Sequence, residues 1–457
     1  MSFKCLILAA GRGMRMKSAM PKVLHPILGI PLIKYVLKTV GSLDPKEVCV
    51  VVGYESELIK KELESKPVKF VTQKEQLGTG HAVMSSKNLF KNYKGQILIL
   101  NGDFPLIKTK TLKSFLKEHI GNSCSVSILT GEAENPRGYG RVIRNEDSSV
   151  VGIIEERDCN RNQKKIKEIN SGAYLVKSEF LWNSLSRLDS NNAQKQLYLP
   201  QIIDIAYKKK EKVGVKKLKD INEILGVNNR NELTNAENII RNEIVLMHMN
   251  RGVTIIDPKS TFISPTVKIG KDSTIYPNTY IYGDSKIGNK CSIGPSVWIK
   301  DSSIGANTNI KMNCFIEETV VKNNVQVGPF ANLRPDTIIE NNAKIGNFVE
   351  LKKTRVGIGS KVPHLSYVGD SILGENVNIG AGTITCNYDG VNKNRTEIGD
   401  GAFIGSDTML VAPIKIGRNA TTGAGSTITK DVPENTLAIE RSKQVSIKNW
   451  KRAQKKK

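Results

Sequence analysis

The chain has 457 residues, of which 39% are hydrophobic and 25% charged, and these proportions exclude wholesale disorder, collagen and a membrane bundle. Its 68 Lys and Arg against 44 Asp and Glu give a net charge of +24, which favours anionic partners, yet no helix-turn-helix, zinc-finger or RNP motif indicates nucleic acid. The seven cysteines are scattered and form no CxxC pair, so we expect neither a disulfide framework nor a thiolate zinc site. The sequence shows no signal-peptide core and no membrane span, so we expect a cytoplasmic protein.

Short apolar runs alternate with helical stretches up to about residue 225. Residues 3–8, 48–52 and 97–100 are typical of buried parallel strands, and each leads into a loop and then a segment of helical character. This alternation predicts an α/β domain over residues 1–228. Residues 229–250 carry apolar side chains at helical spacing, which predicts one long linker helix.

A glycine-rich turn, LAAGRGMRM at residues 8–16, follows the first strand and precedes Pro21 and Lys22. Such a turn lets backbone N–H groups approach phosphate oxygens, and Arg15 and Lys22 can neutralise the phosphate charge. The spacing matches neither GxGxxG nor GxxxxGK, so neither a dinucleotide fingerprint nor a Walker loop is indicated. On the turn alone, a phosphate site and an ordinary structural turn are equally open.

The third predicted strand ends in Asn101, Gly102 and Asp103. Open α/β sheets bind ligands at the carboxyl ends of their parallel strands, and a carboxylate there can hold Mg²⁺ together with phosphate oxygens. Asp103 is therefore a candidate metal ligand. A cap of the following turn is the plain structural alternative.

A six-residue period begins after residue 252. Isoleucine occupies seven consecutive positions six apart, from Ile263 to Ile299, and aliphatic residues keep this spacing to Ile428 with shifts of phase. The pattern predicts a parallel β-helix of about ten coils over residues 251–457, in which each hexapeptide gives a short strand and a corner. Glycine often follows the aliphatic residue, and we expect it to relieve the backbone at the corner.

Two segments, PHLSY at residues 363–367 and TCNYDGVNKNRTE at residues 385–397, interrupt the period, so both are expected to leave the prism as loops. Loops on a rigid scaffold often carry function. His364 lies in the first segment, and Asn387 and Tyr388 lie in the second. A histidine can act as a general base, and amide and hydroxyl groups can donate hydrogen bonds to a developing oxyanion. A structural histidine and a tolerated insertion are the alternatives.

The motifs and their order resemble a known enzyme family. LAAGRGMRM, QLGTGHA (76–82), NGDFP, GYGR (138–141), EIN (168–170) and GVNNR (226–230) are similar to motifs of bacterial sugar-1-phosphate nucleotidylyltransferases. Joined to a hexapeptide β-helix with PHLSY and GAGTITCNYDG, the full chain resembles the bifunctional N-acetylglucosamine-1-phosphate uridylyltransferases and glucosamine-1-phosphate N-acetyltransferases. The resemblance implies a Rossmann-like nucleotidyltransferase domain, a linker helix and a left-handed parallel β-helix.

The activity that the resemblance implies is the synthesis of UDP-N-acetylglucosamine. Acetyl-CoA would acetylate glucosamine-1-phosphate, and UTP would then donate its uridylyl group to N-acetylglucosamine-1-phosphate with Mg²⁺ and release of pyrophosphate. The product would feed peptidoglycan and lipopolysaccharide synthesis. No nucleic acid partner is expected.

For the first domain, the resemblance implies that Arg15 and Lys22 stabilise the charge of the reacting phosphates and that Asp103 and Asn228 coordinate Mg²⁺. It further implies Leu8, Ala9, Ala10 and Gly11 for UTP, Gln73, Gly78 and Thr79 for the uracil, and Asn101, Gly102, Gly140, Glu155 and Asn170 for nucleotide or sugar.

For the β-helix, the resemblance implies His364 as the base and a homotrimer with each acetyl-transfer pocket between neighbouring subunits. It implies Arg334, Lys352, Tyr367 and Asn378 for the sugar phosphate, and Ala381, Asn387, Tyr388, Ser406, Ala424 and Arg441 for sugar or acetyl-CoA. The basic tail, Lys451, Arg452 and residues 455–457, is expected to be a solvated end.

Three departures from the family's usual pattern stand out: Met14 in place of Thr, Asn101 in place of Tyr, and Val362-Pro363 in place of small residues. Methionine donates no hydroxyl hydrogen bond and proline fixes the backbone, so we expect altered phosphate binding and a shifted imidazole. Two alternatives stay open. One is another pyrophosphorylase with a structural β-helix, such as a glucose-1-phosphate adenylyltransferase, and the other is a non-catalytic scaffold or polyanion-binding module.

Overall fold

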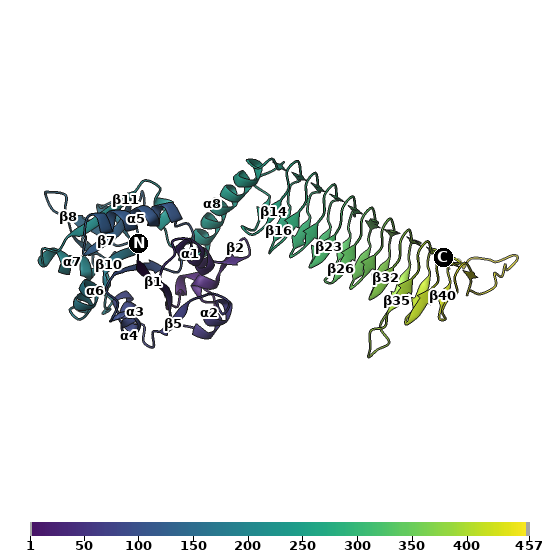
Figure 1. Ribbon diagram of the computed structural model, residues 1–457, viewed down its shortest axis with the longest axis horizontal. Coiled ribbons are helices and arrows are strands. Elements are labelled where there is room, and N and C mark those ends of the chain that lie inside the picture. Colours follow the sequence, from purple (N-terminus) through teal and green to yellow (C-terminus); the bar gives the residue numbers. More distant parts are fainter. Residues whose placement is uncertain (1, 454–457) are drawn as a thin grey trace. The chain divides into compact units, whose positions relative to one another are not determined.

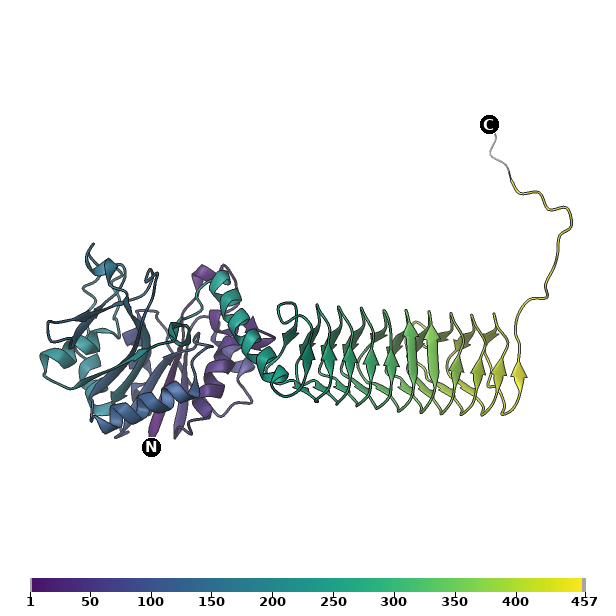
Figure 2. The same ribbon diagram turned by 90° about the horizontal axis from the view of Figure 1, so that it is seen from above.

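The structure, a computed structural model, describes residues 2–453, so the tail residues 455–457 lie outside the described part. The chain divides into two compact units between Ile240 and Arg241, inside helix α8 (Arg230–Met249). Figures 1 and 2 trace both units. The predicted domain boundaries, at residues 228 and 250, lie at the two ends of this helix rather than within it, and they remain a proposal. Across residues 2–453, no helix has the length and apolar character needed to cross a membrane.

The first unit is built on a mixed sheet with strand order β11-β7-β10-β6-β1-β4-β5. The three predicted strands are present, and β1 pairs in parallel with both β4 and β6, whereas β10 runs antiparallel to β6 and β7. β8 and β9 form an antiparallel extension beside β10. The strand bounds are β1 Phe3–Ala9, β4 Glu47–Val52, β5 Lys69–Thr72, β6 Gln96–Asn101, β7 Val126–Glu132, β8 Arg141–Arg144, β9 Val150–Ile154, β10 Glu168–Lys177 and β11 Val213–Leu218.

Helices cover both faces of this sheet, which explains why β1 and β6 are apolar over most of their length. Leu6 and Ile7 of β1 are both fully buried, but they belong to different hydrophobic clusters, one on each face. One cluster includes residues of α1 (Leu32–Gly41), α2 (Ser56–Glu62) and α5 (Thr109–Gly121); the other includes residues of α3 (Thr79–Ser85), α4 (Lys87–Phe90), α6 (Ser178–Leu185) and α7 (Gln201–Lys208). The carboxyl ends of β1 and β6 are thereby held in a rigid frame.

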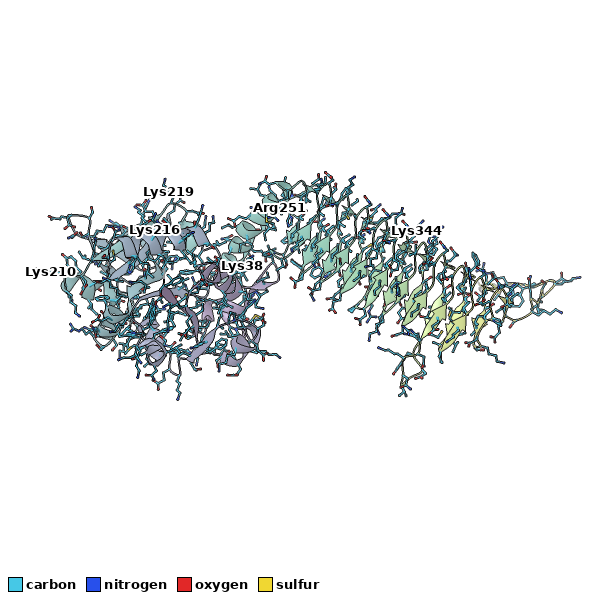
Figure 3. All side chains as sticks on the ribbon, in the orientation of Figure 1. Lys38, Lys210, Lys216, Lys219, Arg251 and Lys344 are labelled. Atoms are coloured by element: carbon cyan, nitrogen blue, oxygen red, sulfur yellow. The ribbon has the colours of Figure 1, made fainter. Side chains whose placement is uncertain are left out.

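The second unit is the predicted parallel β-helix. Its short strands, from β12 (Thr254–Ile255) to β41 (Leu437–Ala438), form three parallel sheets of 11, 10 and 9 strands. Equivalent isoleucines stack from coil to coil, as Ile263, Ile281 and Ile299 do, and these side chains are fully buried inside the prism. The stacked coils are seen from the side in Figure 2. Basic side chains project from both units, as the six labelled in Figure 3 show.

The glycines of the repeat have a role other than the expected one. Gly288 and Gly294 follow the inward isoleucine, but positive φ angles occur two residues later, at Lys290 (55°) and Ser296 (57°). A Cβ built on Gly288 would lie 2.6 Å from the backbone nitrogen of Ala306 in the next coil. The prediction that glycine relieves the corner was therefore wrong at these positions. Glycine is needed there because adjacent coils approach too closely for a side chain.

One of the two expected loops does not leave the prism. β30 (Lys361–His364) pairs in parallel with β27 (Lys344–Asn347), and β31 (Tyr367–Gly369) pairs with β28 (Glu350–Lys352). PHLSY is thus an ordinary strand and corner. The prediction was wrong because the inward residues on either side of it, Val362 and Val368, are still six apart.

The second interruption does form a loop. Residues 387–395 connect β34 (Ile384–Cys386) to β35 (Thr396–Ile398) and contain an isolated antiparallel bridge between Tyr388 and Lys393. Figure 1 shows this loop leaving the β-helix next to β35. The prism continues in register beyond it, since β32 (Ser371–Leu373) pairs directly with β35.

Candidate active sites

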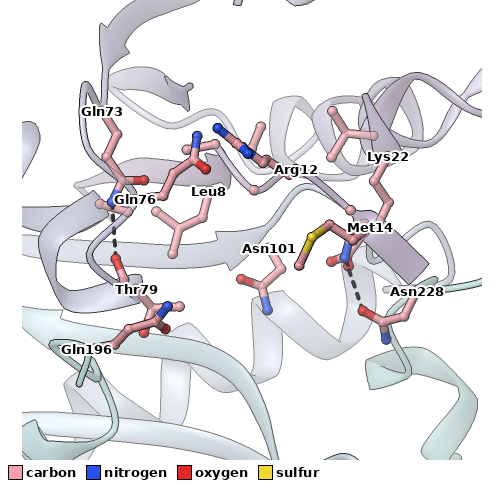
Figure 4. A pocket seen from close by; sticks show the side chains of 18 residues that line it. Leu8, Arg12, Met14, Lys22, Gln73, Gln76, Thr79, Asn101, Gln196 and Asn228 are labelled. Carbon is pink, nitrogen blue, oxygen red and sulfur yellow. Dashed lines mark hydrogen bonds and ion pairs between the residues drawn. The ribbon is translucent and has the colours of Figure 1, made fainter. Parts of the chain in front are cut away.

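The first candidate site is a cavity of about 490 Å³ at the carboxyl ends of β1 and β6 (Figure 4). A second cavity, of about 170 Å³, shares five lining residues with it, so the two adjoin. The first is lined by the predicted residues Leu8, Ala9, Ala10, Gly11, Lys22, Gln73, Gly78, Thr79, Asn101, Asp103 and Asn228; the second adds Arg15, Gly140, Glu155 and Asn170. Gly102 lies between two lining residues without lining either cavity itself.

The glycine-rich turn forms one wall of the larger cavity. Gly13 has a φ of 62°, and a Cβ there would lie 2.7 Å from the Cβ of Lys22, so the turn packs tightly against that side chain. A Cβ on Gly11, by contrast, would meet no atom within 4 Å. Met14 also lines the cavity, and it is 82% exposed. Its thioether can only accept weakly, so the position offers a ligand contact area without a hydroxyl donor.

Two cationic side chains converge on the candidate metal ligands. The Lys22 ammonium donates to Asp103 Oδ2 and, at 3.1 Å, to Asn228 Oδ1. The Arg15 guanidinium donates to the same Asn228 oxygen at 2.9 Å. Figure 4 shows the Lys22–Asn228 bond across the cavity. The sequence did not predict that Lys22 contacts Asp103, because the two residues are 81 positions apart.

Asp103 keeps one carboxylate oxygen free for a ligand. The residue is 6% exposed, and its Oδ1 has no hydrogen-bond partner among the residues that the structure describes. A buried oxygen without a partner beside an amide oxygen is a donor set that suits a hard divalent cation. Residues 2–453 contain no group of three or more His, Cys, Asp or Glu that could hold a metal ion. Phosphate and water oxygens would have to complete the coordination.

A narrow corner of the larger cavity is formed by the predicted uracil residues. Gln73 is buried, and its Nε2 donates to the carbonyl oxygen of Gly78 at 3.2 Å. Gly78 has a φ of 110°, and a Cβ there would lie 2.5 Å from the carbonyl oxygen of Leu197. Thr79 Oγ1 accepts from the backbone N–H of Leu199 at 3.0 Å. Backbone groups thus fix the shape of this corner.

The smaller cavity carries the predicted sugar contacts. Burial raises the pKa of Glu155. A Cβ on Gly140 would lie 3.1 Å from Ile153 Cγ2 and 3.2 Å from Glu155 Oε1, so glycine gives these two side chains more room than any other residue would. Asn170 Nδ2 donates to the Tyr174 hydroxyl at 2.8 Å. Tyr139 was not predicted, although it lies in the GYGR motif; burial and then the nearby carboxylates raise its pKa to about 12.

The second candidate site lies on the β-helix around His364. The imidazole is exposed, and its Nδ1 is 2.6 Å from Asn347 Oδ1 in the preceding coil. With the amide oxygen accepting from Nδ1, the lone pair of Nε2 is free to take a proton. Pro363 lies within β30, and His364 nevertheless stays in register with Asn347. Sequence reasoning missed Asn347, because it lies 17 residues earlier and only the coil register brings it to the imidazole.

Four of the six residues predicted for sugar or acetyl-CoA, Ala381, Ser406, Ala424 and Arg441, lie in one column along an edge of the prism. Strand registers place Ala381 next to His364, then Ser406, then Ala424 on successive coils. Backbone bonds run along the same edge, from Asp407 N to the oxygen of Ala381 at 2.7 Å and from Gly425 N to that of Ser406 at 2.8 Å. At the far end, Arg441 Nη1 donates to the Ala424 oxygen at 2.8 Å. The column is therefore a path of small residues between the His364 imidazole and the Arg441 guanidinium.

The predicted sugar-phosphate residues lie on the neighbouring strands of the prism. Arg334 Nη1 donates to Glu350 Oε1 at 2.8 Å, and the Lys352 ammonium lies close enough to Lys393 to lower the pKa of Lys393. Two like charges at such a distance favour an anion between them. Lys393 was not predicted, and its place in the loop of residues 387–395 was its only signal. Tyr367 lies in β31 and Asn378 in β33 (Asn378–Ile379). Asn387 and Tyr388, predicted for sugar or acetyl-CoA, lie at the start of that loop.

Comparison with known proteins extends over both units. The chain matches the nucleotidyl transferase family model over residues 4–224, the EIF2B subunit epsilon LbH domain over residues 247–351 and the bacterial transferase hexapeptide (six repeats) over residues 395–430. It is also similar to proteins named "Bifunctional protein GlmU". The protein from Caldanaerobacter subterraneus subsp. tengcongensis is 48% identical over 97% of this chain and 96% of its own length. That from Thermosipho africanus is 50% identical over 98% and 96%, and that from Geotalea uraniireducens is 44% identical over 98% of each.

Proposed function

Because the chain belongs to the GlmU family of bifunctional transferases, we propose that each of its two units performs one of the two reactions that make UDP-N-acetylglucosamine. The β-helix acetylates glucosamine-1-phosphate, and the α/β unit transfers the uridylyl group of UTP to N-acetylglucosamine-1-phosphate. The observation that carries this assignment is that one chain holds both a phosphate-suited cavity at β1 and β6 and the His364 column. The similarity to the GlmU family extends over both units. It therefore does not favour either alternative, a pyrophosphorylase whose β-helix is only structural or a non-catalytic scaffold.

One incubation tests the assignment. UTP, Mg²⁺, acetyl-CoA and glucosamine-1-phosphate are mixed with the purified chain, and UDP-N-acetylglucosamine and free CoA are measured by mass spectrometry. We expect both products. Omission of acetyl-CoA should abolish UDP-N-acetylglucosamine, and supplied N-acetylglucosamine-1-phosphate should restore it. UDP-glucosamine as the product would contradict the proposed order of reactions.

In the uridylyl transfer, the phosphate oxygen of the sugar attacks the α-phosphorus of UTP in line, and the bond to pyrophosphate breaks. The attacking group is already an anion, so no protein nucleophile is required. Arg15 and Lys22 lie where they can neutralise charge on the phosphates, and the glycine-rich turn can donate backbone N–H groups. Bound Mg²⁺ would supply further charge neutralisation at the phosphates.

We assign Mg²⁺ to Asp103 and Asn228, with Lys22 as the side chain that must make way for it. The Lys22 ammonium contacts the Asn228 oxygen and Oδ2 of Asp103, whereas Asp103 Oδ1 has no partner among the described residues. Lysine and metal would therefore compete for the Asn228 oxygen, and their positive charges would repel each other at Asp103. When Lys22 leaves Asp103, its charge becomes available to the phosphates.

Replacement of Lys22 by Met should therefore tighten metal binding, because it removes a competing cation from both ligands. We expect the dissociation constant for Mn²⁺, a paramagnetic substitute for Mg²⁺, to fall about tenfold, measured by electron paramagnetic resonance. Arg15→Met is the matched control, since Arg15 reaches Asn228 but has no bond to Asp103; its effect should be smaller. Unchanged Mn²⁺ affinity in Lys22→Met would contradict the competition.

In the acetyl transfer, the amine of glucosamine-1-phosphate attacks the thioester carbon of acetyl-CoA. A C–N bond forms and the C–S bond breaks, the amine proton passes to His364 Nε2, and His364 then gives it to the departing thiolate, so that CoA leaves as its thiol. Asn347 orients the imidazole through Nδ1. Arg334, Lys352 and Lys393 supply the positive charge that a sugar phosphate requires.

We further propose a cytoplasmic homotrimer in which neighbouring subunits complete each acetyl-transfer pocket. Sedimentation should give a mass of about three times 50.4 kDa. A monomer with full acetyl-transfer activity would contradict the proposal.

A further inference from the structure

One corner of the β-helix changes in side-chain size next to His364. The residue at this corner has a positive φ, between 48° and 78°, in nine successive coils. Six of the nine are residues that tolerate a left-handed backbone or are small, namely Asn278, Ser296, Asn313, Gly382, Asp407 and Gly425. The other three are Phe330, Phe348 and Leu365, for which the left-handed region is strained.

Packing inside the chain does not account for these three side chains. Phe330, Phe348 and Leu365 are 43%, 55% and 61% exposed, although large apolar residues usually gain stability by burial. The two phenyl rings stack on each other with centroids 5.1 Å apart. Backbone strain at apolar side chains that stay exposed to this extent often marks a functional position. The bulky side chains occupy three consecutive coils, and the last of these is the coil of His364.

On the other side of His364, the same corner carries only small or short side chains. The next coils carry Ala381 with Gly382, Ser406 with Asp407, and Ala424 with Gly425. Coils are about 4.8 Å apart, so this row of small residues extends about 14 Å from His364 to the level of Ala424 and Arg441. An extended acyl-CoA arm lying on this edge, with its phosphates toward the guanidinium, would end at His364 and meet Leu365.

We propose that Leu365, backed by Phe348, is the specificity-determining wall that restricts the acyl donor to acetyl-CoA. The inference rests on the proposed acetyl transfer at His364. An acetyl methyl group fits against the leucine side chain, whereas each further methylene of a longer acyl group would overlap with it. The small residues beyond His364 present no such barrier to the arm itself.

The test measures acyl preference as the ratio of kcat/KM for propionyl-CoA to kcat/KM for acetyl-CoA. Leu365→Gly should raise this ratio at least about tenfold, the discrimination that one methylene commonly provides in an apolar pocket. Phe330→Gly is the matched control, because it likewise replaces a bulky apolar residue with glycine at the same kind of corner, two coils away from His364. Its ratio should stay that of the wild type.

The outcomes separate this inference from the proposed function. Acetyl transfer by Leu365→Gly with a wild-type acyl ratio overturns the wall and leaves the function intact, and an equal rise in both variants also overturns it. A wild-type chain that does not acetylate glucosamine-1-phosphate overturns the proposed function itself. If Leu365→Gly does not fold, Leu365→Asn gives the same test, since asparagine occupies this corner at residues 278 and 313.

Discussion

Asp103→Ala is expected to lower uridylyl transfer at least about a hundredfold at saturating Mg²⁺. Asp103 is the only carboxylate that we assign to the metal, and its unpartnered Oδ1 is buried at the cavity wall. The loss should be measured as pyrophosphate release with supplied N-acetylglucosamine-1-phosphate. Weaker Mn²⁺ binding by the same variant is a second readout that does not depend on activity.

Two controls make the Asp103 result specific. Acetyl transfer by the same preparation should hardly change, because Asp103 lies in the first unit and the His364 column in the second. Asp103→Asn keeps the shape of the side chain and removes only its charge, so it should retain the fold while losing metal affinity. Wild-type uridylyl transfer by Asp103→Ala would show that the metal site is elsewhere.

His364→Ala is expected to lower acetyl transfer by about 10²- to 10⁴-fold, the usual contribution of a positioned general base. Uridylyl transfer by the same variant should stay intact. Both half-reactions should be assayed on one purified sample whose assembly has been verified by sedimentation. Equal loss of both activities would indicate a folding defect, and undiminished acetyl transfer would remove His364 from the mechanism.

Asn347→Ala refines this experiment, because Asn347 contacts the imidazole of His364. We expect a smaller loss of acetyl transfer than in His364→Ala, with the loss in kcat and an unchanged KM, because the hydrogen bond at Nδ1 orients the base. A wild-type kcat would show that Asn347 has no positioning role.

The inward residues of the β-helix were predictable because their period is intrinsic to the fold. Ile263, Ile281 and Ile299 needed only their spacing to be placed inside the prism. The corners were less predictable. Proline and histidine in PHLSY suggested a loop, yet Val362 and Val368 keep the six-residue spacing and hold the segment in the prism.

Contacts between distant residues explain what the sequence could not predict at the two sites. The bonds of Lys22 to Asp103 and Asn228 depend on how β1, β6 and the residues before α8 meet. Asn347 reaches His364 through coil register alone. Motifs identified the chemical groups, whereas the fold determined which groups share a hydrogen bond.

The end of the β-helix has a consequence for how the acetyl donor is bound. Each coil is supported by the coil before it and the coil after it, but β41 pairs only with β39 (Thr421–Thr422) on one side. In a solenoid, the stability of each coil depends on its contacts with the neighbouring coils. A terminal coil has only one neighbour, so it unfolds most readily. Arg441 lies three residues beyond the end of β41 (Leu437–Ala438). The guanidinium that we propose for the donor's phosphates therefore follows the least supported coil, and binding of the donor there should slow amide hydrogen exchange in that coil first.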